Sequence, residues 1–329
     1  MTPFAASPYF VAQRLGRWRW PWLMVAFVAA LFGLAIGFGV LYLLVTLGTL
    51  SDESWLESLQ TGVALEGSDP ASEPFVVAGE FLVVGFIFWS GAIVGNLVQG
   101  RPVRALVVPA RPFRWVIVGK VLAASVLLAV VLTSFQLLVV PGDTEVAFTT
   151  LGVEQLAWFI PMSLIVLIQT SGEDVFFKGW LLHRLGAVTR VVWLAPLTVT
   201  VIFVALHLGN ADFDSDLVVL LPLFLLSEFM IMYLIIRTGG MEAALVLHWV
   251  NNIAIVFFLA ERTTQANDLT LLVSETPGAQ NALVDEEIVG AASIAISYLL
   301  MLVAFVWKRS PFHLEQYHPP REVALSENV

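Results

Sequence analysis

Three short motifs place functional groups four residues apart in apolar surroundings. They are Glu173-Asp174-x-x-x-Lys178, Phe203-x-x-x-His207 and His248-x-x-x-Asn252. Residues i and i+4 lie on one face of a helix, so each spacing brings side chains together. Ionisable groups inside apolar spans cost at least about 2.5 kcal/mol on insertion scales, which makes each one a functional-site hypothesis.

The first motif combines two acids and a base. Asp174 and Lys178 can pair on one helical face, which leaves Glu173 turned by about 100° and facing elsewhere. A carboxyl group removed from water suits general acid–base catalysis. The alternative is an ion-paired helix end at the membrane surface, and this motif alone favours neither.

Two histidines stand in apolar segments, unlike the others of the chain's 5. We expect the Phe203 ring to pack beneath His207 and hold it toward the bundle interior. His248 and Asn252 share a face, with Asn251 close to it, and could supply a proton donor and a hydrogen-bond donor to a developing oxyanion. The alternative for each is a structural hydrogen bond between helices, but three such accidents in succession are less plausible.

A further acid, Glu228, stands near the middle of an apolar segment and must face the interior. It could orient a histidine or Lys178, and the sequence leaves both open. Its predicted role is a supporting one.

The composition indicates that membrane helices position these groups. The chain has 329 residues, of which 58% are hydrophobic and only 13% are charged, against about 25% charged residues in soluble domains. This excludes an ordinary cytosolic enzyme, a disordered chain and a basic nucleic-acid binder, so we expect no nucleic-acid partner. With 0 cysteines, disulfides, thiolate metal sites and a cysteine nucleophile are excluded.

Apolar blocks of the length that crosses a bilayer, about 20 residues, recur along the chain. They cover residues 21–50, 81–100, 121–142, 155–172, 191–211, 216–237, 243–260 and 288–307. We predict an all-α, polytopic integral membrane protein with eight transmembrane helices, forming a single transmembrane domain over residues 1–329. The three motifs fall in a catalytic core at residues 150–260.

Loop charges predict the orientation of these helices. Every basic residue except Arg262 falls in the terminal segments or in alternate loops, which places both termini in the cytoplasm. The other loops are acidic and predicted to be extracytoplasmic, above all residues 51–74 and 261–287. We expect a multi-pass protein of the cell membrane, in contact with the lipid bilayer.

The three motifs should also lie at one depth. Counted from the basic loops, Glu173 and His248 lie about 16 Å deep, whereas His207 lies about 25 Å from Arg190. The depths agree if the fifth helix begins at Pro196, a favoured first-turn residue. We therefore predict a short surface segment before Pro196.

Taken together, the motifs resemble the CPBP family of intramembrane proteases, which includes the type II CAAX prenyl endopeptidases and bacteriocin-processing proteins. The family pattern is Glu-Glu-x-x-x-Arg, Phe-x-x-x-His and His-x-x-x-Asn on successive helices, and it matches over about residues 150–260. The resemblance implies that Glu173 activates the attacking water, aided by His207, while His248 and Asn252 stabilise the oxyanion. The supporting residues would be Asp174, Lys178, Phe203, Asn251 and Glu228.

The first motif departs from the family pattern at two positions. Asp174 replaces the second Glu, and Lys178 replaces Arg, which exchanges a bidentate fork for a point charge. The signs of the charges are kept, so the pair can persist. We expect an active intramembrane endopeptidase that acts on a peptide or membrane-protein substrate, with a protein partner in the membrane as a further candidate.

Three alternatives remain open. Glu173, His207 and His248 could form a His₂Glu set of zinc type, although we favour a metal-free glutamate mechanism without a cofactor. A proton-coupled transporter also uses intramembrane carboxylates and histidines, but the sequence contains no evident inverted repeat. A non-catalytic membrane partner of the same fold is the third alternative.

Overall fold

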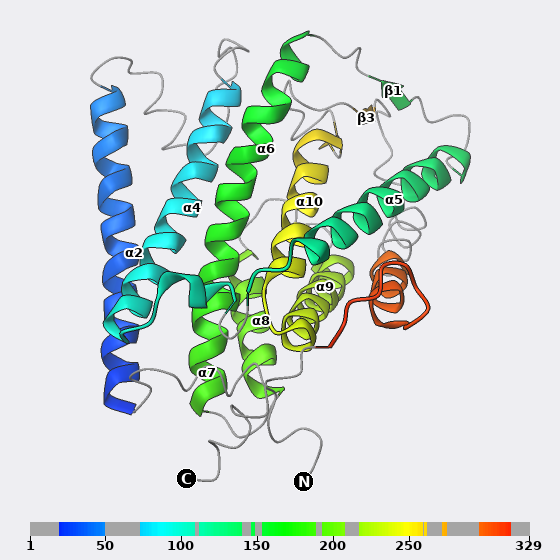
Figure 1. Cartoon of the computed structure of the whole chain (residues 1–329). Helices are drawn as coiled ribbons and strands as arrows, with labels where there is room; N and C mark the ends of the chain where they lie inside the picture. Colours follow the sequence, from blue (N-terminus) through cyan, green and yellow to red (C-terminus); the bar gives the residue numbers. More distant parts are fainter. Residues whose placement is uncertain are drawn as a thin grey trace.

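The computed structural model describes residues 20–49, 73–108, 112–139, 146–148, 153–188, 193–207, 217–258, 260–261, 272–274 and 296–316. Within these residues the fold is helical, as predicted (Figure 1). Its longer helices are α2 (Trp20–Thr49), α4 (Glu73–Val98), α5 (Trp115–Val139), α6 (Val153–Asp174), α7 (Leu182–Val188), α8 (Leu194–His207), α9 (Leu217–Thr238), α10 (Glu242–Phe258) and a C-terminal helix at Ile296–Val306.

A helix occupies each predicted apolar block. Three of the described helices are long and apolar enough to cross a membrane, at Phe81–Val98, Ala157–Gly186 and Leu221–Thr238. The shorter apolar helices are Met24–Gly39, Trp115–Leu128, Leu194–His207 and Ile296–Val306. The number of membrane crossings and the side of the termini stay predictions, and the acidic loops at 51–74 and 261–287 lie almost wholly outside the described residues.

The fourth helix does not end at Gly172, as the sequence had suggested. α6 runs through Glu173 and Asp174 and continues as the π-helix η3 (Val175–Leu181), which leads directly into α7. The prediction assumed that these two charged residues mark the point where the helix reaches water. Instead both side chains are buried, Glu173 at 5% and Asp174 at 0% exposure, so the helix continues past them. π-helical turns are rare and often occur at functional sites.

α8 begins close to the predicted start of the fifth crossing helix. Its first residue is Leu194, so Pro196 lies in the first turn. Proline is tolerated there because the first N–H groups of a helix have no partner within it. Within the described residues α8 ends at His207. A helix this short is what the prediction requires if His207 is to lie at the same depth in the membrane as Glu173 and His248.

Glycines let α2, α4 and α6 approach closely (Figure 1). A Cβ added to Gly33 would lie 2.8 Å from Gly91 Cα, and one added to Gly172 would collide with the Gly85 backbone. Small residues at helix contacts are typical of membrane bundles. The position of Glu173, next to Gly172, is therefore fixed by backbone-to-backbone packing.

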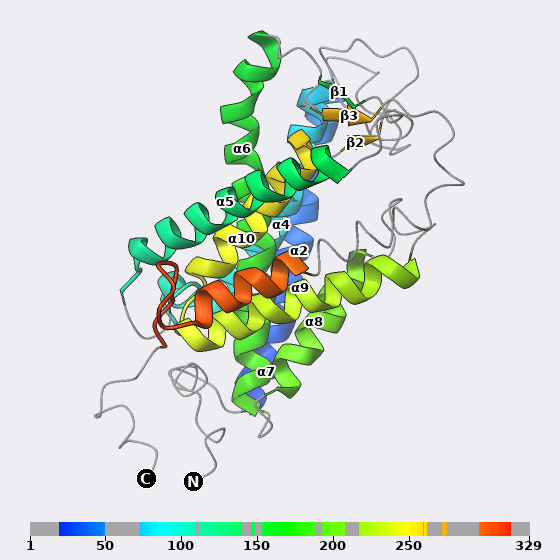
Figure 2. The same cartoon turned by 90° about the vertical axis from the view of Figure 1, so that its right-hand side faces the viewer.

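Several helices of the bundle are steeply tilted relative to α6. Figure 2 shows α5, α9 and the C-terminal helix running at a steep angle to α6. Beyond the helices, β1 (Val146–Phe148), β2 (Ala260–Glu261) and β3 (Leu272–Ser274) form a small sheet in the order β1-β3-β2. β1 pairs antiparallel and β2 parallel to β3, and these strands are not predicted from the sequence.

Candidate active site

α6 with η3, α8 and α10 bring the three motifs together around one aromatic ring. The ring of Phe203, 1% exposed, has its centroid 5.3 Å from that of Phe177 in η3 and 5.9 Å from that of His248 in α10. Phe203 and its neighbour Phe177 belong to the same buried core. The predicted site therefore lies in the interior of the bundle.

His248 lies between the two acids of the first motif. Its Nδ1 is 2.9 Å from Asp174 Oδ1, and its Nε2 is 3.6 Å from Glu173 Oε2. The expectation that Glu173 faces elsewhere is therefore wrong. Two adjacent carboxylates that are turned by about 100° can reach opposite nitrogens of one imidazole when that ring stands between them.

Lys178 is held by two carboxylates. Its Nζ lies 2.6 Å from Asp174 Oδ1 and 3.0 Å from Glu228 Oε2, with all three side chains buried. Of the two partners left open for Glu228, the structure thus selects Lys178. Nζ also lies 4.9 Å from the centroid of the Phe203 ring. Buried charges are retained when they are paired in this way.

The two oxygens of Glu173 have different surroundings. Oε1 accepts a 2.7 Å hydrogen bond from Gln169 Nε2, and Gln169 Oε1 accepts one of 3.1 Å from Asn252 Nδ2. Oε2 faces His248 and has no hydrogen-bond partner among the described residues. Because native structures leave few buried polar atoms unbonded, Oε2 is a candidate position for water or substrate.

His207 reaches this group from the end of α8. As predicted, its ring packs on Phe203, with 4.5 Å between centroids, and its Nδ1 lies 2.8 Å from the Phe203 carbonyl oxygen. The edge of Phe224 from α9 closes another side at 5.2 Å. Since a carbonyl only accepts, Nδ1 carries the proton and Nε2 is an acceptor in the neutral ring. His207 lies near Glu173.

Asn251 is the predicted site residue that lies apart from this group. It is exposed and accepts a 3.4 Å hydrogen bond from Tyr298 Oη in the C-terminal helix. At one residue before Asn252, it stands on the flank of α10 that faces away from α6. The other predicted residues, catalytic and supporting, lie within the group.

Two members of the group, Gln169 and Phe224, are absent from the sequence prediction. Gln169 stands four residues before Glu173 in an apolar run, so the spacing rule that paired Asp174 with Lys178 could have found it. Phe224 is one of 23 phenylalanines, and nothing in its surroundings distinguishes it.

The ring nitrogens of both histidines are oriented by their partners. Nδ1 of His248 is engaged by Asp174, and Nδ1 of His207 by the Phe203 carbonyl, so the two Nε2 atoms are the ring positions left to act near Glu173. The described part of the chain contains no group of three His, Asp or Glu side chains that could hold a metal ion.

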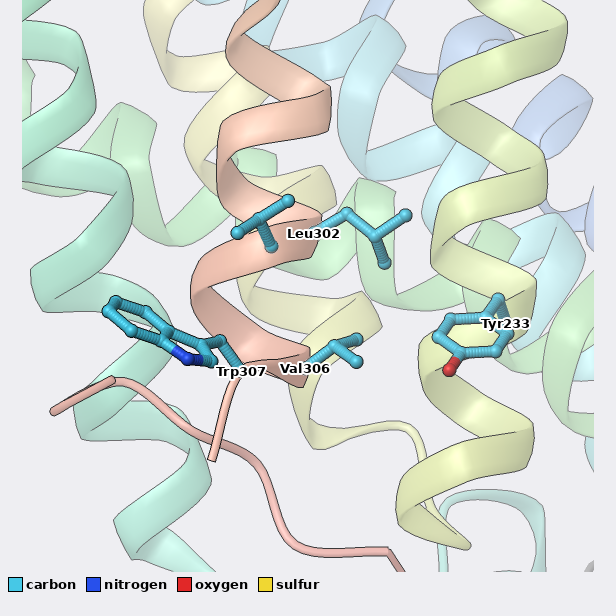
Figure 3. A pocket seen from close by; sticks show the side chains of 5 residues that line it. Tyr233, Leu302, Val306 and Trp307 are labelled. Atoms are coloured by element: carbon cyan, nitrogen blue, oxygen red, sulfur yellow. The ribbon is translucent and has the colours of Figure 1, made fainter. Parts of the chain in front are cut away.

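A cavity of about 620 Å³ lies elsewhere, between α9 and the C-terminal helix. It is lined by Tyr233, Leu302, Val303, Val306 and Trp307 (Figure 3). Figure 3 shows Leu302 and Val306 pointing from the C-terminal helix toward Tyr233 on α9. This lining is apolar apart from a phenol and an indole N–H, and it contains none of the residues of the site around Glu173.

Comparison with known proteins agrees with the motifs. Residues 153–254 match the sequence model of the family described as type II CAAX prenyl endopeptidase Rce1-like. The uncharacterized protein YyaK of Bacillus subtilis (strain 168) is 26% identical over 205 residues, which cover 62% of this chain and 64% of YyaK. The chain thus spans less than two thirds of that relative's length. No solved structure matches the chain.

The matched segment contains all three motifs, from Glu173 to Asn252, on the helices whose contacts form the site. The resemblance to the CPBP family, first indicated by the spacing of these residues, is thereby confirmed. Residues 153–254 are thus similar to the Rce1-like family.

Proposed function

We propose that this chain is an intramembrane endopeptidase in which Glu173 activates water. The observation that carries the proposal is the asymmetry of the Glu173 carboxylate. Gln169 holds one oxygen, while the other lies 3.6 Å from His248 Nε2 and is unbonded among the described residues. A general base needs an oriented carboxylate with one oxygen open to its substrate. The family name of the matched segment refers to endopeptidases, which supports this reading.

In the proposed reaction, Glu173 Oε2 takes a proton from water as the water oxygen forms a bond to the scissile carbonyl carbon. His207 Nε2 accepts the second hydrogen bond of the same water and orients it. The 2.8 Å contact of His207 Nδ1 with the Phe203 carbonyl keeps that nitrogen protonated and so keeps Nε2 an acceptor. The base and the orienting ring thus come from α6 and α8.

The carbonyl oxygen then becomes an oxyanion, which α10 stabilises. His248, protonated on both nitrogens, donates Nδ1–H to Asp174 and Nε2–H to the oxyanion. Asn252 has two amide protons; one is used by Gln169 at 3.1 Å, and the other is proposed to reach the oxyanion. As the C–N bond breaks and the carbonyl re-forms, Glu173 passes its proton to the leaving nitrogen.

Asp174, Lys178 and Glu228 act as positioning residues behind His248. Asp174 Oδ1 lies within 2.6 Å of Lys178 Nζ and 2.9 Å of His248 Nδ1, so the cation fixes the carboxylate that fixes the ring. Lys178 also offsets part of the negative charge that Glu173, Asp174 and Glu228 would otherwise concentrate in the interior.

The proposed setting is the cell membrane, with a multi-pass chain, both termini in the cytoplasm and a peptide or membrane-protein substrate. The name of the matched family suggests prenylated CAAX C-termini as the first substrate to try.

We propose that no metal takes part, because the carboxylate and the two imidazoles supply the acid–base steps. Activity is then expected to survive EDTA and 1,10-phenanthroline, whereas loss that zinc restores would contradict the metal-free mechanism.

The test is cleavage of a fluorogenic peptide ending in a prenylated CAAX sequence by the purified full-length protein, with the unprenylated peptide in parallel. Glu173→Gln keeps the shape of the side chain and removes the base, so we expect kcat to fall about 10²–10⁴-fold. His248→Ala is expected to fall about 10²–10³-fold, as for the loss of an oxyanion donor. Glu315→Gln, at an exposed carboxylate, is the matched control and should cleave at the wild-type rate.

Undiminished turnover by both variants would overturn the proposed mechanism. A stable partner that co-purifies from membranes without any cleavage product would instead indicate the non-catalytic module. Proton flux in proteoliposomes that is lost on neutralising Glu173 or Glu228 would indicate the transporter.

A further inference from the structure

A second group of polar side chains is buried where α4 ends and α7 begins. Gln99 is 0% exposed, Arg101 4%, His183 0% and Arg184 6%. Arg101 lies near His183, so the residues just after α4 and the first turn of α7 are close in space. The proposed peptidase reaction uses none of these residues.

The packing of α4 against η3 puts Gln99 and Arg184 at the same end of one helix contact. The chain runs in the same direction through both segments (Figure 1). A Cβ added to Gly95 would lie 2.7 Å from Trp180 Nε1, so these two residues face each other. Residues i and i+4 share a helical face, and one turn further along lie Gln99 after Gly95 and Arg184 after Trp180. Gln99 and Arg184 therefore lie at the same end of the α4–η3 contact.

The donors of this pair lack acceptors. Arg184 Nε and Nη2, and both polar side-chain atoms of Gln99, have no hydrogen-bond partner within the described part of the chain. Trp180 Nε1, one turn away, is also unbonded there. A guanidinium stays charged in proteins, and a buried charge is strongly unfavourable unless it is paired. An anion between the two helix ends would pair it.

The depth of Gln99 and Arg184 in the membrane indicates which anion would pair with the guanidinium. The candidate spans Phe81–Val98 and Ala157–Gly186 end within two residues of Gln99 and Arg184. Residues at the end of a span meet the headgroup layer of the bilayer, where phospholipid phosphates lie. Basic pockets between transmembrane helices bind such headgroups, and a guanidinium binds phosphate through two parallel hydrogen bonds.

We propose that the end of α4 and the start of α7 form a binding site for the phosphate of a membrane phospholipid. Arg184 donates from Nε and Nη2, Gln99 donates its amide N–H, and Arg101 adds a second positive charge close by. The acyl chains lie along the outer face of α4, where Leu97 is 56% exposed. This site stands independently of the peptidase proposal.

The test compares two lipids with the same acyl chains: phosphatidylglycerol, and a galactosyl diacylglycerol that lacks phosphate. Each is added to the purified full-length protein in neutral detergent, with Tm and lipid retention in native mass spectrometry as readouts. A ligand that binds only the folded state raises Tm, so we expect a rise of several degrees with phosphatidylglycerol alone. Arg184→Gln should weaken its binding about tenfold or more. Arg104→Gln, exposed in the neighbouring turn, is the matched control.

Two further variants keep the test decisive if Arg184→Gln does not fold. Arg184→Lys keeps the charge and loses the fork, and Gln99→Leu removes the amide; both should lower the affinity. Equal stabilisation by the two lipids, or undiminished phosphatidylglycerol binding by the folded variants, would overturn the proposal. Stabilisation by inorganic phosphate but not by phosphatidylglycerol would indicate a free anion and would overturn the assignment to a lipid.

Discussion

Gln169 connects two residues that the proposed reaction uses in different steps. It donates to Glu173 at 2.7 Å and accepts from Asn252 at 3.1 Å. Gln169→Leu removes both bonds with little change in size, so Glu173 and Asn252 lose their fixed orientation. We expect kcat for the CAAX peptide to fall about tenfold or more, with KM little changed, because geometry at the reacting atoms is what the bonds preserve.

The neighbouring residue provides the control for this variant. Thr170 is equally buried, but its hydroxyl bonds only to backbone carbonyls of its own helix, at 2.9 Å and 3.4 Å. Thr170→Val should therefore keep kcat. Equal losses in the two variants would assign Gln169 a purely structural role.

Lys178 pairs with both Asp174 and Glu228 in the buried site, which makes its removal costly. Lys178→Met leaves Asp174 and Glu228 as uncompensated buried charges, a change that typically costs about 3–5 kcal/mol. Lys178→Arg restores the residue of the family pattern and keeps the charge. We expect the first variant to unfold at a much lower Tm in detergent and the second to stay near wild type. A Lys178→Met protein as stable as wild type would contradict the role given to the pair.

At the scale of elements, close backbone contact between α4 and α6 determines where Glu173 stands. A Cβ at Gly172 meets the Gly85 backbone, whereas one at Gly119, in α5, meets nothing within 4 Å. Gly172→Ala should therefore cost about 1–3 kcal/mol as an overpacked contact. Gly119→Ala should be neutral or stabilise the helix by up to about 1 kcal/mol. Thermal unfolding of both variants checks the pair, and equal Tm values would contradict the close contact.

Elements and site differ in how far the sequence predicts them. Apolar runs predict the helices, and the i, i+4 rule predicts the Asp174–Lys178 pair and the stacking of Phe203 on His207, because both depend on short-range regularities. The place of Asn251 and the partner of Glu228 depend on the rotation of one helix against another, which the spacing does not encode. The π-helix is equally unpredicted, since nothing in VFFKGWL requires more than an ordinary helical turn.

At the scale of the whole molecule, the arrangement of loops makes the predicted orientation testable. The chain contains 0 cysteines, so a single introduced thiol is the only one present. Arg104→Cys lies in a segment predicted to be cytoplasmic, and Ser274→Cys lies in β3, in a loop predicted to be extracytoplasmic. A membrane-impermeant maleimide should label Ser274→Cys in intact cells and Arg104→Cys only after permeabilisation. The reverse pattern would invert the orientation.

The π-helix η3 changes the directions in which side chains before and after it point from one continuous helix. A π-turn holds one residue more than an α-turn, so the chain after Leu181 is rotated by about 100° relative to an uninterrupted α-helix. In Figure 1, α10 and α4 lie on opposite sides of α6. The angular offset separates the direction of Glu173, toward His248 of α10, from that of Arg184, which is proposed to lie toward the end of α4. Deleting one residue within Val175–Leu181 would leave Glu173 directed toward α10. The same deletion would rotate Arg184 about the helix axis, away from the end of α4. A one-residue deletion in the π-helix should therefore abolish headgroup binding and leave proteolysis intact.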